Sequence, residues 1–111
     1  MMKKFLIVKS NRKYKKLFVD EILYCKADGG YTGFYFSGDK EPVWACYLLK
    51  EVEEMLAEAP FFRVNRTYLV NLGHCYELST ETNDIVLSNG EKISVSRARM
   101  KLFIQAFLAY S

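Results

Sequence analysis

The chain has 111 residues, half of them hydrophobic, and a formal net charge of +3 at pH 7. This length favours a single domain over residues 1–111, and the high hydrophobic content excludes a disordered protein. The mild positive charge is compatible with a nucleic-acid partner but does not require one. The basic residues concentrate in three segments, residues 9–16, 63–66 and 97–101, so their placement is more informative than their number.

The cysteines indicate a reducing compartment. Cys25, Cys46 and Cys75 are odd in number and widely spaced, which argues against a disulfide framework.

The basic start MMKK precedes an apolar run of only four residues, which is too short for a signal peptide. No apolar run approaches the length of a membrane span. We therefore expect a cytoplasmic protein that is not associated with a membrane.

The first half of the chain has the pattern of a β-meander. Strands are expected at residues 5–8, 17–19, 22–27, 31–36 and 43–46. The polar, basic segment SNRKYKK at residues 10–16 is expected to form a hairpin tip. Two glycine-containing segments, residues 28–30 and 37–40, predict turns between the later strands.

The pattern then becomes helical. Apolar residues recur on one helical face at Leu48, Leu49, Val52, Met55 and Leu56. Charged residues cover the opposite face, and Pro60 ends the helix. The apolar face is expected to pack against the core, and a groove for a partner is the alternative.

Residues 61–71, FFRVNRTYLVN, predict a strand that carries basic residues. Apolar and polar residues alternate from Phe62 to Asn65, and the alternation slips at residues 66–68. The slip predicts a turn or bulge that directs Arg66 outward. Such a segment suits contact with phosphates and base edges. The alternative is a solvated strand edge whose positive charges block aggregation.

The last third combines a hairpin and a helix. Residues 85–95 predict a hairpin, because Asn89-Gly90 tolerates the positive φ angles of a type I′ turn. Ser96 is expected to cap a C-terminal helix, whose apolar face comprises Met100, Phe103, Ile104, Phe107 and Leu108. Basic residues in its first turns oppose the helix dipole, which suggests that a phosphate backbone supplies their counter-charge.

No motif in the sequence predicts an enzyme, a metal site or a cofactor. His74 is the single histidine, and its neighbour Cys75 is not part of a metal-ligand pair of the usual spacing. Nucleophile-elbow, Walker and dinucleotide-binding patterns are absent from the sequence. The aromatic residues of segment 31–36 could stack single-stranded bases, but alternation places at least two of them in the core.

Four segments in order, DEILYCKADGGYT, LLKEVEEML, FFRVNRTYLVN and LSNGEKISVSRARM, resemble the LytTR family of bacterial DNA-binding domains. The resemblance covers about residues 5–108. It implies a mostly-β fold, in which small antiparallel sheets pack together with one internal amphipathic helix and a C-terminal helix. It also implies that loops, rather than a recognition helix, enter successive major grooves of duplex DNA.

By this resemblance, the DNA-binding loops follow Asp28, Asn65 and Val95. The positions expected to contact bases are Thr32, Arg66 and Arg97. The positions expected to contact the DNA backbone are Tyr31, Arg63, Asn65, Thr67, Arg99 and Lys101. Arginine can bond guanine O6 and N7 together, whereas Thr32 has an equally good alternative as a plain turn residue. The alternative for Arg66 is a surface salt bridge.

These features predict a sequence-specific bacterial transcription regulator that binds double-stranded DNA. Two copies are expected on repeated half-sites, because one small module buries little surface. Family members usually carry a receiver domain or membrane segments ahead of this domain. We therefore expect either a cut-out two-component effector, whose missing receiver would control dimerisation, or a small regulator that stands alone.

A protein-interaction or small-ligand domain is the rival prediction. In that case the aromatic segment 31–36 and Trp44 would line a pocket. Clustering decides between the two: Arg66, Arg97 and Arg99 on one face favour DNA, whereas scattered arginines around an aromatic cavity favour the rival.

Overall fold

The computed structural model describes residues 4–110, which form three antiparallel sheets and two α-helices. The strands are β1 (Phe5–Ser10), β2 (Lys13–Phe18), β3 (Ile22–Asp28), β4 (Tyr31–Phe36), β5 (Val43–Ala45), β6 (Phe61–Arg63), β7 (Tyr68–Asn71), β8 (Cys75–Ser79), β9 (Asp84–Leu87) and β10 (Lys92–Ser94). The helices are α1 (Leu49–Met55) and α2 (Met100–Tyr110), and three short 3₁₀ turns are η1 (Val19–Glu21), η2 (Leu72–His74) and η3 (Arg97–Arg99).

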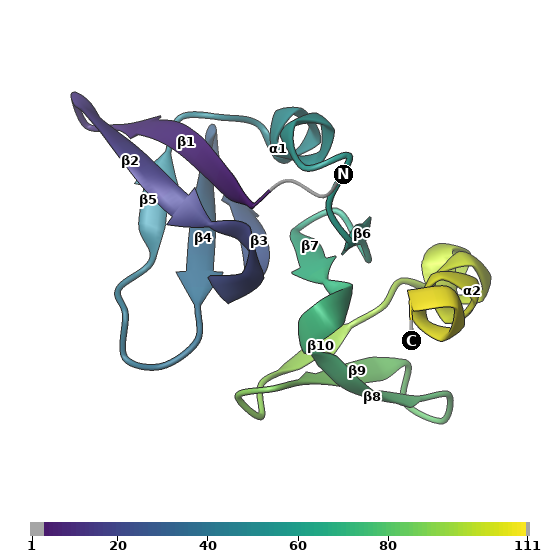
Figure 1. Ribbon diagram of the computed structural model, residues 1–111. Coiled ribbons are helices and arrows are strands. Elements are labelled where there is room, and N and C mark those ends of the chain that lie inside the picture. Colours follow the sequence, from purple (N-terminus) through teal and green to yellow (C-terminus); the bar gives the residue numbers. More distant parts are fainter. Residues whose placement is uncertain (1–3, 111) are drawn as a thin grey trace.

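A central sheet with strand order β5-β4-β3-β7-β6 organises the fold. The β1–β2 hairpin lies on one side of it, and the β10-β9-β8 sheet and α2 lie on the other (Figure 1). This arrangement confirms the predicted fold class of small antiparallel sheets with one internal and one C-terminal helix.

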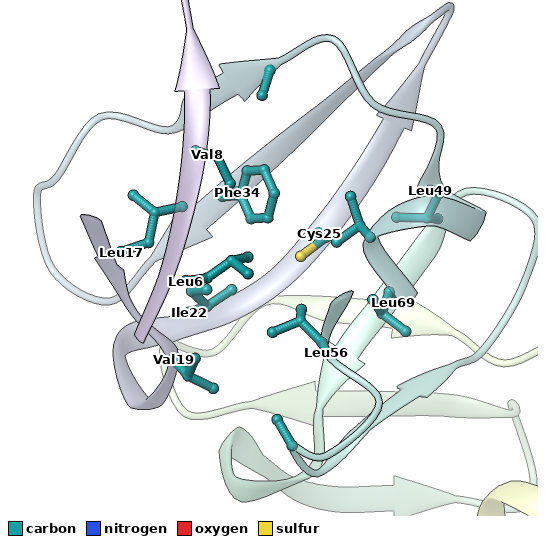
Figure 2. Packing of buried hydrophobic residues seen from close by; sticks show 13 residues of the cluster. Leu6, Val8, Leu17, Val19, Ile22, Cys25, Phe34, Leu49, Leu56 and Leu69 are labelled. Atoms are coloured by element: carbon teal, nitrogen blue, oxygen red, sulfur yellow. The ribbon is translucent and has the colours of Figure 1, made fainter. Parts of the chain in front are cut away.

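Each face of the central sheet contacts a separate hydrophobic core. In β3, Cys25 belongs to the first core and Tyr24 to the second, and in β7 the same division separates Leu69 from Val70. The division follows from the pleat, because successive side chains in a strand point to opposite faces. Figure 2 shows the first core, where Phe34 of the sheet meets the hairpin and α1. The expectation that the apolar face of α1 packs in the core is confirmed.

The two hairpin turns differ from the prediction. β2 begins at Lys13, so the β1–β2 tip is a two-residue turn in which Asn11 and Arg12 have φ angles of 49° and 69°. In the β9–β10 connection only Gly90 has a positive φ, 88°. There Gly90 N–H donates to the Leu87 carbonyl at 2.8 Å, which closes a turn that ends in a left-handed glycine. The predicted pair of positive φ angles therefore occurs in the first hairpin and not at Asn89-Gly90.

The C-terminal helix begins later than predicted. α2 starts at Met100, and the preceding residues form η3. Ser96 precedes η3, but its side chain makes no capping hydrogen bond. Instead, the Ser96 N–H donates to the Val64 carbonyl at 2.9 Å. A tertiary contact thus takes the place of the cap and holds this segment against the end of β6.

Candidate nucleic-acid interface

Two of the three predicted DNA-binding loops lie together at one end of the central sheet. Ala27 of β3 pairs with Thr32 of β4 beside the β3–β4 turn. On the other side of β3, the Ala27 N–H donates to the Thr67 carbonyl at 2.8 Å. The β3–β4 turn and the β6–β7 turn are therefore neighbours across β3.

The third segment joins them through Asn65. The Asn65 side-chain NH₂ donates to the Ser94 carbonyl at 2.7 Å, which ties the β6–β7 turn to the end of β10. The Asn65 Oδ1 accepts from the N–H groups of Thr67 and Tyr68 at 2.8 and 2.9 Å. This Asn side chain builds the turn, as asparagine commonly does by bonding the backbone two residues ahead. With these three bonds, Asn65 acts as a positioning residue.

Arg63 stabilises the same turn by hydrogen bonds to its backbone. Its Nε donates to the Asn65 carbonyl at 2.9 Å, and its terminal NH₂ donates to the Arg66 carbonyl at 2.8 Å. The other terminal nitrogen lies 3.5 Å from the Glu53 carboxylate of α1. The guanidinium of Arg63 is thus engaged with the protein and has only limited capacity for a phosphate.

Arg99 supports the edge of β6. Its Nε donates to the Arg63 carbonyl at 3.1 Å, and its guanidinium lies 5.0 Å from the centre of the Phe62 ring. A cation over an aromatic face is held in a fixed direction. No hydrogen bond within residues 4–110 involves its terminal nitrogens. Arg99 therefore combines a structural contact with donors that remain available to an external acceptor.

Arg66 and Arg97 differ from the other arginines of this region. Both are exposed, and neither guanidinium forms a hydrogen bond or ion pair within the described residues. Arg66 lines a groove of about 650 Å³ together with Arg63, Asn65, Thr67, Ser96 and Arg99. Arg97 lies between Ser96 and Ala98, which also line this groove. Arg66 and Arg99 thus share one groove, which is part of the clustering that favours DNA over the rival.

The β3–β4 turn presents a different residue than expected. Thr32 is fully buried, and its hydroxyl donates to the Tyr47 carbonyl at 2.8 Å. This position does not fit the base contact expected of Thr32, because the side chain faces the protein. Alternation along β4 places the preceding residue on the surface, and Tyr31 is 54% exposed.

Thr67 and Lys101, the remaining predicted backbone contacts, are both accessible from the surface. Thr67 is half-buried in the groove, and Lys101 is exposed in the first turn of α2. Their side chains form no hydrogen bond within residues 4–110. Both can therefore donate to an external phosphate without breaking an internal contact.

The aromatic segment predicted by the rival hypothesis is mostly core. Phe34 is fully buried, and Tyr35 stacks on Tyr24 with ring centroids 4.7 Å apart. Trp44 covers Gly33 so closely that a Cβ there would lie 2.8 Å from the indole ring. The rings of Phe34 and Tyr35 are therefore used for packing, whereas Tyr31 and Trp44 line a second groove together with Lys9 and Arg12.

The single histidine and two of the cysteines are engaged within the fold. The two ring nitrogens of His74 contact the Ser88 hydroxyl at 2.8 Å and the Asp20 carbonyl at 2.6 Å. Burial raises the pKa of the Cys75 thiol to about 12 and raises that of Cys25 as well. Within residues 4–110, no three potential metal-ligating side chains converge. No helix in the same residues is both long and apolar enough to span a membrane.

Sequence reasoning missed two partners in this site, Glu53 and Ser94. Glu53 lies on the charged face of α1, and its carboxylate is 3.5 Å from the Arg63 guanidinium of β6. Ser94 contributes its backbone carbonyl, for which the sequence contains no signal. The charge pattern of α1 was the only available clue, because a carboxylate beside a basic strand can form an ion pair.

Comparisons with known proteins identify the family and the fold of the chain. A family model described as the LytTr DNA-binding domain matches residues 12–107. The solved structure of a LytTr DNA-binding domain from Bacillus cereus is similar in fold, with a TM-score of 0.76 at 21% sequence identity. That match covers 94% of this chain and 96% of the other. No curated protein sequence matches the chain. Because the family model covers most of its length, the chain belongs to the LytTR family of DNA-binding domains.

Proposed function

We propose that this domain binds double-stranded DNA in a sequence-specific manner and regulates bacterial transcription. In this proposal the β6–β7 turn and the segment around η3 enter the major groove. The supporting observation is that Arg66 and Arg97 are exposed and unpaired within residues 4–110, beside a turn that internal hydrogen bonds already hold. A free guanidinium on a fixed backbone is suited to bidentate recognition of a guanine edge.

The neighbouring residues divide into two roles. Arg63 and Asn65 position the turn, because their polar groups bond backbone atoms of the turn and of β10. Thr67, Arg99 and Lys101 donate to phosphates. Tyr31 takes the place of Thr32 as the contact from the β3–β4 turn, since its side chain is exposed. Phosphate contacts fix the register on the duplex, whereas the two arginines select bases.

The size of the interface suggests how the domain is arranged on DNA. A single module of this size buries limited DNA surface, so two copies on repeated half-sites provide the affinity and the site length that regulation requires. We place this activity in the cytoplasm, where the chromosome is. A receiver domain, as in two-component regulators, is a natural source of the signal that would bring the two copies together.

The test is fluorescence anisotropy of a labelled duplex from the promoter next to this protein's own gene. Wild type, Arg66→Ala and Arg97→Ala are compared on that duplex and on a scrambled one, at several salt concentrations. We expect affinity to fall steeply with salt. Each mutant should lose about 1–3 kcal/mol of preference for the specific duplex, because one guanine contact is removed.

Lys92→Ala is the matched control, since Lys92 is an exposed cation at the far end of β10 from Ser94. It should retain the wild-type preference. If wild type binds neither duplex at low salt, the proposal fails for this chain. If both arginine variants retain full preference, DNA binding stands but base selection by Arg66 and Arg97 does not.

A further inference from the structure

The β1–β2 hairpin is the most basic element of the chain. Between Phe5 and Phe18 the sequence contains Lys9, Arg12, Lys13, Lys15 and Lys16 and no acidic residue. The described residues form only two ion pairs, and neither involves the hairpin. Five neighbouring cations without internal counter-charge repel one another, so an anionic partner would relieve this repulsion.

The hairpin tip is anchored at the end of the central sheet that carries the proposed DNA-binding loops. The Ser10 hydroxyl donates to the Trp44 carbonyl at 2.6 Å, and the Lys9 N–H donates to the Tyr47 hydroxyl at 3.3 Å. Next to these residues, Ala45 of β5 pairs with Thr32 beside the β3–β4 turn. The tip therefore continues the row of loops beyond β5, on the side away from the β6–β7 turn (Figure 1).

A groove of about 660 Å³ connects the tip to the β3–β4 turn. Lys9 and Arg12 line it on one side, and Tyr31 and Trp44 line it on the other. Its walls thus combine two cations with two aromatic rings. Cations suit the phosphates of a nucleic-acid backbone, and flat apolar rings suit its sugars.

The backbone of Arg12 supplies an independent indication. Among residues 4–110, Arg12 is the one residue with positive φ that is neither glycine nor asparagine. A left-handed conformation is unfavourable for a residue with a long side chain, and such strain concentrates at functional sites. Glycine takes the corresponding conformation at position 90 of the β9–β10 turn. A turn with no role beyond joining two strands would favour glycine at position 12 as well.

We infer that the β1–β2 tip is an additional DNA-backbone contact, in which Arg12 and Lys9 bind phosphates that flank the recognised bases. This inference rests on the proposed function, because it needs the domain to bind DNA. Neighbouring strands are about 4.8 Å apart, and about four and a half such spacings separate the tip from the β6–β7 turn, so the two lie roughly 20–25 Å apart across the sheet. That separation corresponds to about six base pairs.

The variant that tests this inference is Arg12→Gly, because it is expected to weaken DNA binding without lowering stability. Glycine relieves the left-handed strain, so the thermal midpoint should stay the same or rise. Loss of one phosphate contact should weaken DNA affinity about eightfold at 0.1 M salt. It should also reduce the slope of log K against log salt by about 0.9.

Two further comparisons identify the kind of contact. Arg12→Lys should retain the wild-type salt slope, since a phosphate accepts either cation whereas guanine recognition favours arginine. A duplex trimmed by about six base pairs on the flank next to the tip should bind wild type and Arg12→Gly equally. Lys92→Ala, which alters a cation at the far end of β10, is the control and should match wild type on both duplexes.

The outcomes separate this inference from the proposed function. If wild type binds the promoter duplex and Arg12→Gly binds it with the same affinity and salt slope, the hairpin contact is overturned and DNA binding stands. An equal loss on the full and trimmed duplexes would also overturn a flanking contact. If wild type itself does not bind DNA, both the proposed function and the hairpin contact fail.

Discussion

Arg63 and Arg66 are only three positions apart, yet their side chains have different surroundings. The Arg63 guanidinium bonds the carbonyls of Asn65 and Arg66 and lies beside Glu53. The Arg66 side chain has none of these contacts and extends from the turn into solvent. The first residue therefore maintains the shape of the turn, and the second is free to meet a partner.

Substitution should separate these two roles. Arg63→Ala should lower the free energy of unfolding by about 1–3 kcal/mol, because two turn carbonyls lose their donor. Arg66→Ala should change it by less than about 0.5 kcal/mol, as is usual for an exposed side chain without contacts. Urea unfolding measures both values. Equal destabilisation by the two variants would contradict the assigned roles.

At the residue scale, part of the candidate site could be predicted from the sequence. The exposure of Arg66 followed from the slip in alternation after Asn65, which is a local pattern. The roles of Arg63 and Asn65 could not be predicted in this way. They depend on Glu53, ten residues away from Arg63, and on the Ser94 carbonyl, 29 residues away from Asn65. The burial of Thr32 likewise depends on Tyr47, a neighbour from outside its own hairpin.

Among the secondary-structure elements, β4 is fixed in its sheet by a close contact between a glycine and an indole. Gly33 pairs with Trp44 across β4 and β5, and the indole occupies the space where a Cβ would be. A side chain at position 33 would therefore displace the ring. The displacement would disturb the wall of the groove beneath the β1–β2 tip, which Trp44 also lines.

Gly33→Ala should therefore destabilise the domain by about 1–3 kcal/mol, the usual effect of overpacking. In a Trp44→Ala background the same change should be close to neutral, because the space is then open. A double-mutant cycle from urea unfolding of the four proteins measures the coupling. Equal effects of Gly33→Ala in both backgrounds would show that the contact does not limit this position.

The elements themselves were largely predictable, whereas their connections were not. Alternation and helical spacing located the strands and both helices, because these periodicities arise from local geometry. The hairpin tip predicted within residues 10–16 is a tighter turn than expected, at Asn11-Arg12, because arginine rarely has the positive φ that it has there. The start of α2 was misplaced because the tertiary contact from Ser96 to Val64 takes the place of a helix cap.

For the molecule as a whole, the two cores share the strands that separate them. Neighbouring residues of β3 and β7 point into opposite cores, so neither core can lose its packing without disturbing the same two strands. Tyr24 also links the central sheet to the β10-β9-β8 sheet, because its hydroxyl donates to the Glu91 carboxylate of the β9–β10 connection at 2.9 Å. These links favour a single cooperative unfolding transition.

Phe103→Leu tests this cooperativity from one side of the sheet. Phe103 is fully buried in the second core, and its replacement should cost about 1–2 kcal/mol. Trp44 is the single tryptophan, and its ring packs edge-on against Tyr35. Its neighbours Val43 and Ala45 in β5 pack in the first core, so its fluorescence reports on a strand that this core holds. Its unfolding midpoint in urea should shift together with that of far-UV circular dichroism. Separate midpoints would indicate two independently unfolding units.

The way in which the β6–β7 turn is held also affects how this protein can evolve. The turn is held through the backbone carbonyl of Arg66, which accepts from Arg63, whereas the Arg66 side chain has no internal role. Selection for folding therefore places little constraint on the side chain at this position, so the residue can drift or adapt while the domain stays intact. Under the proposed function, duplicated genes encoding this domain acquire new operators by one codon change each, and regulatory networks diverge without an intermediate that fails to fold.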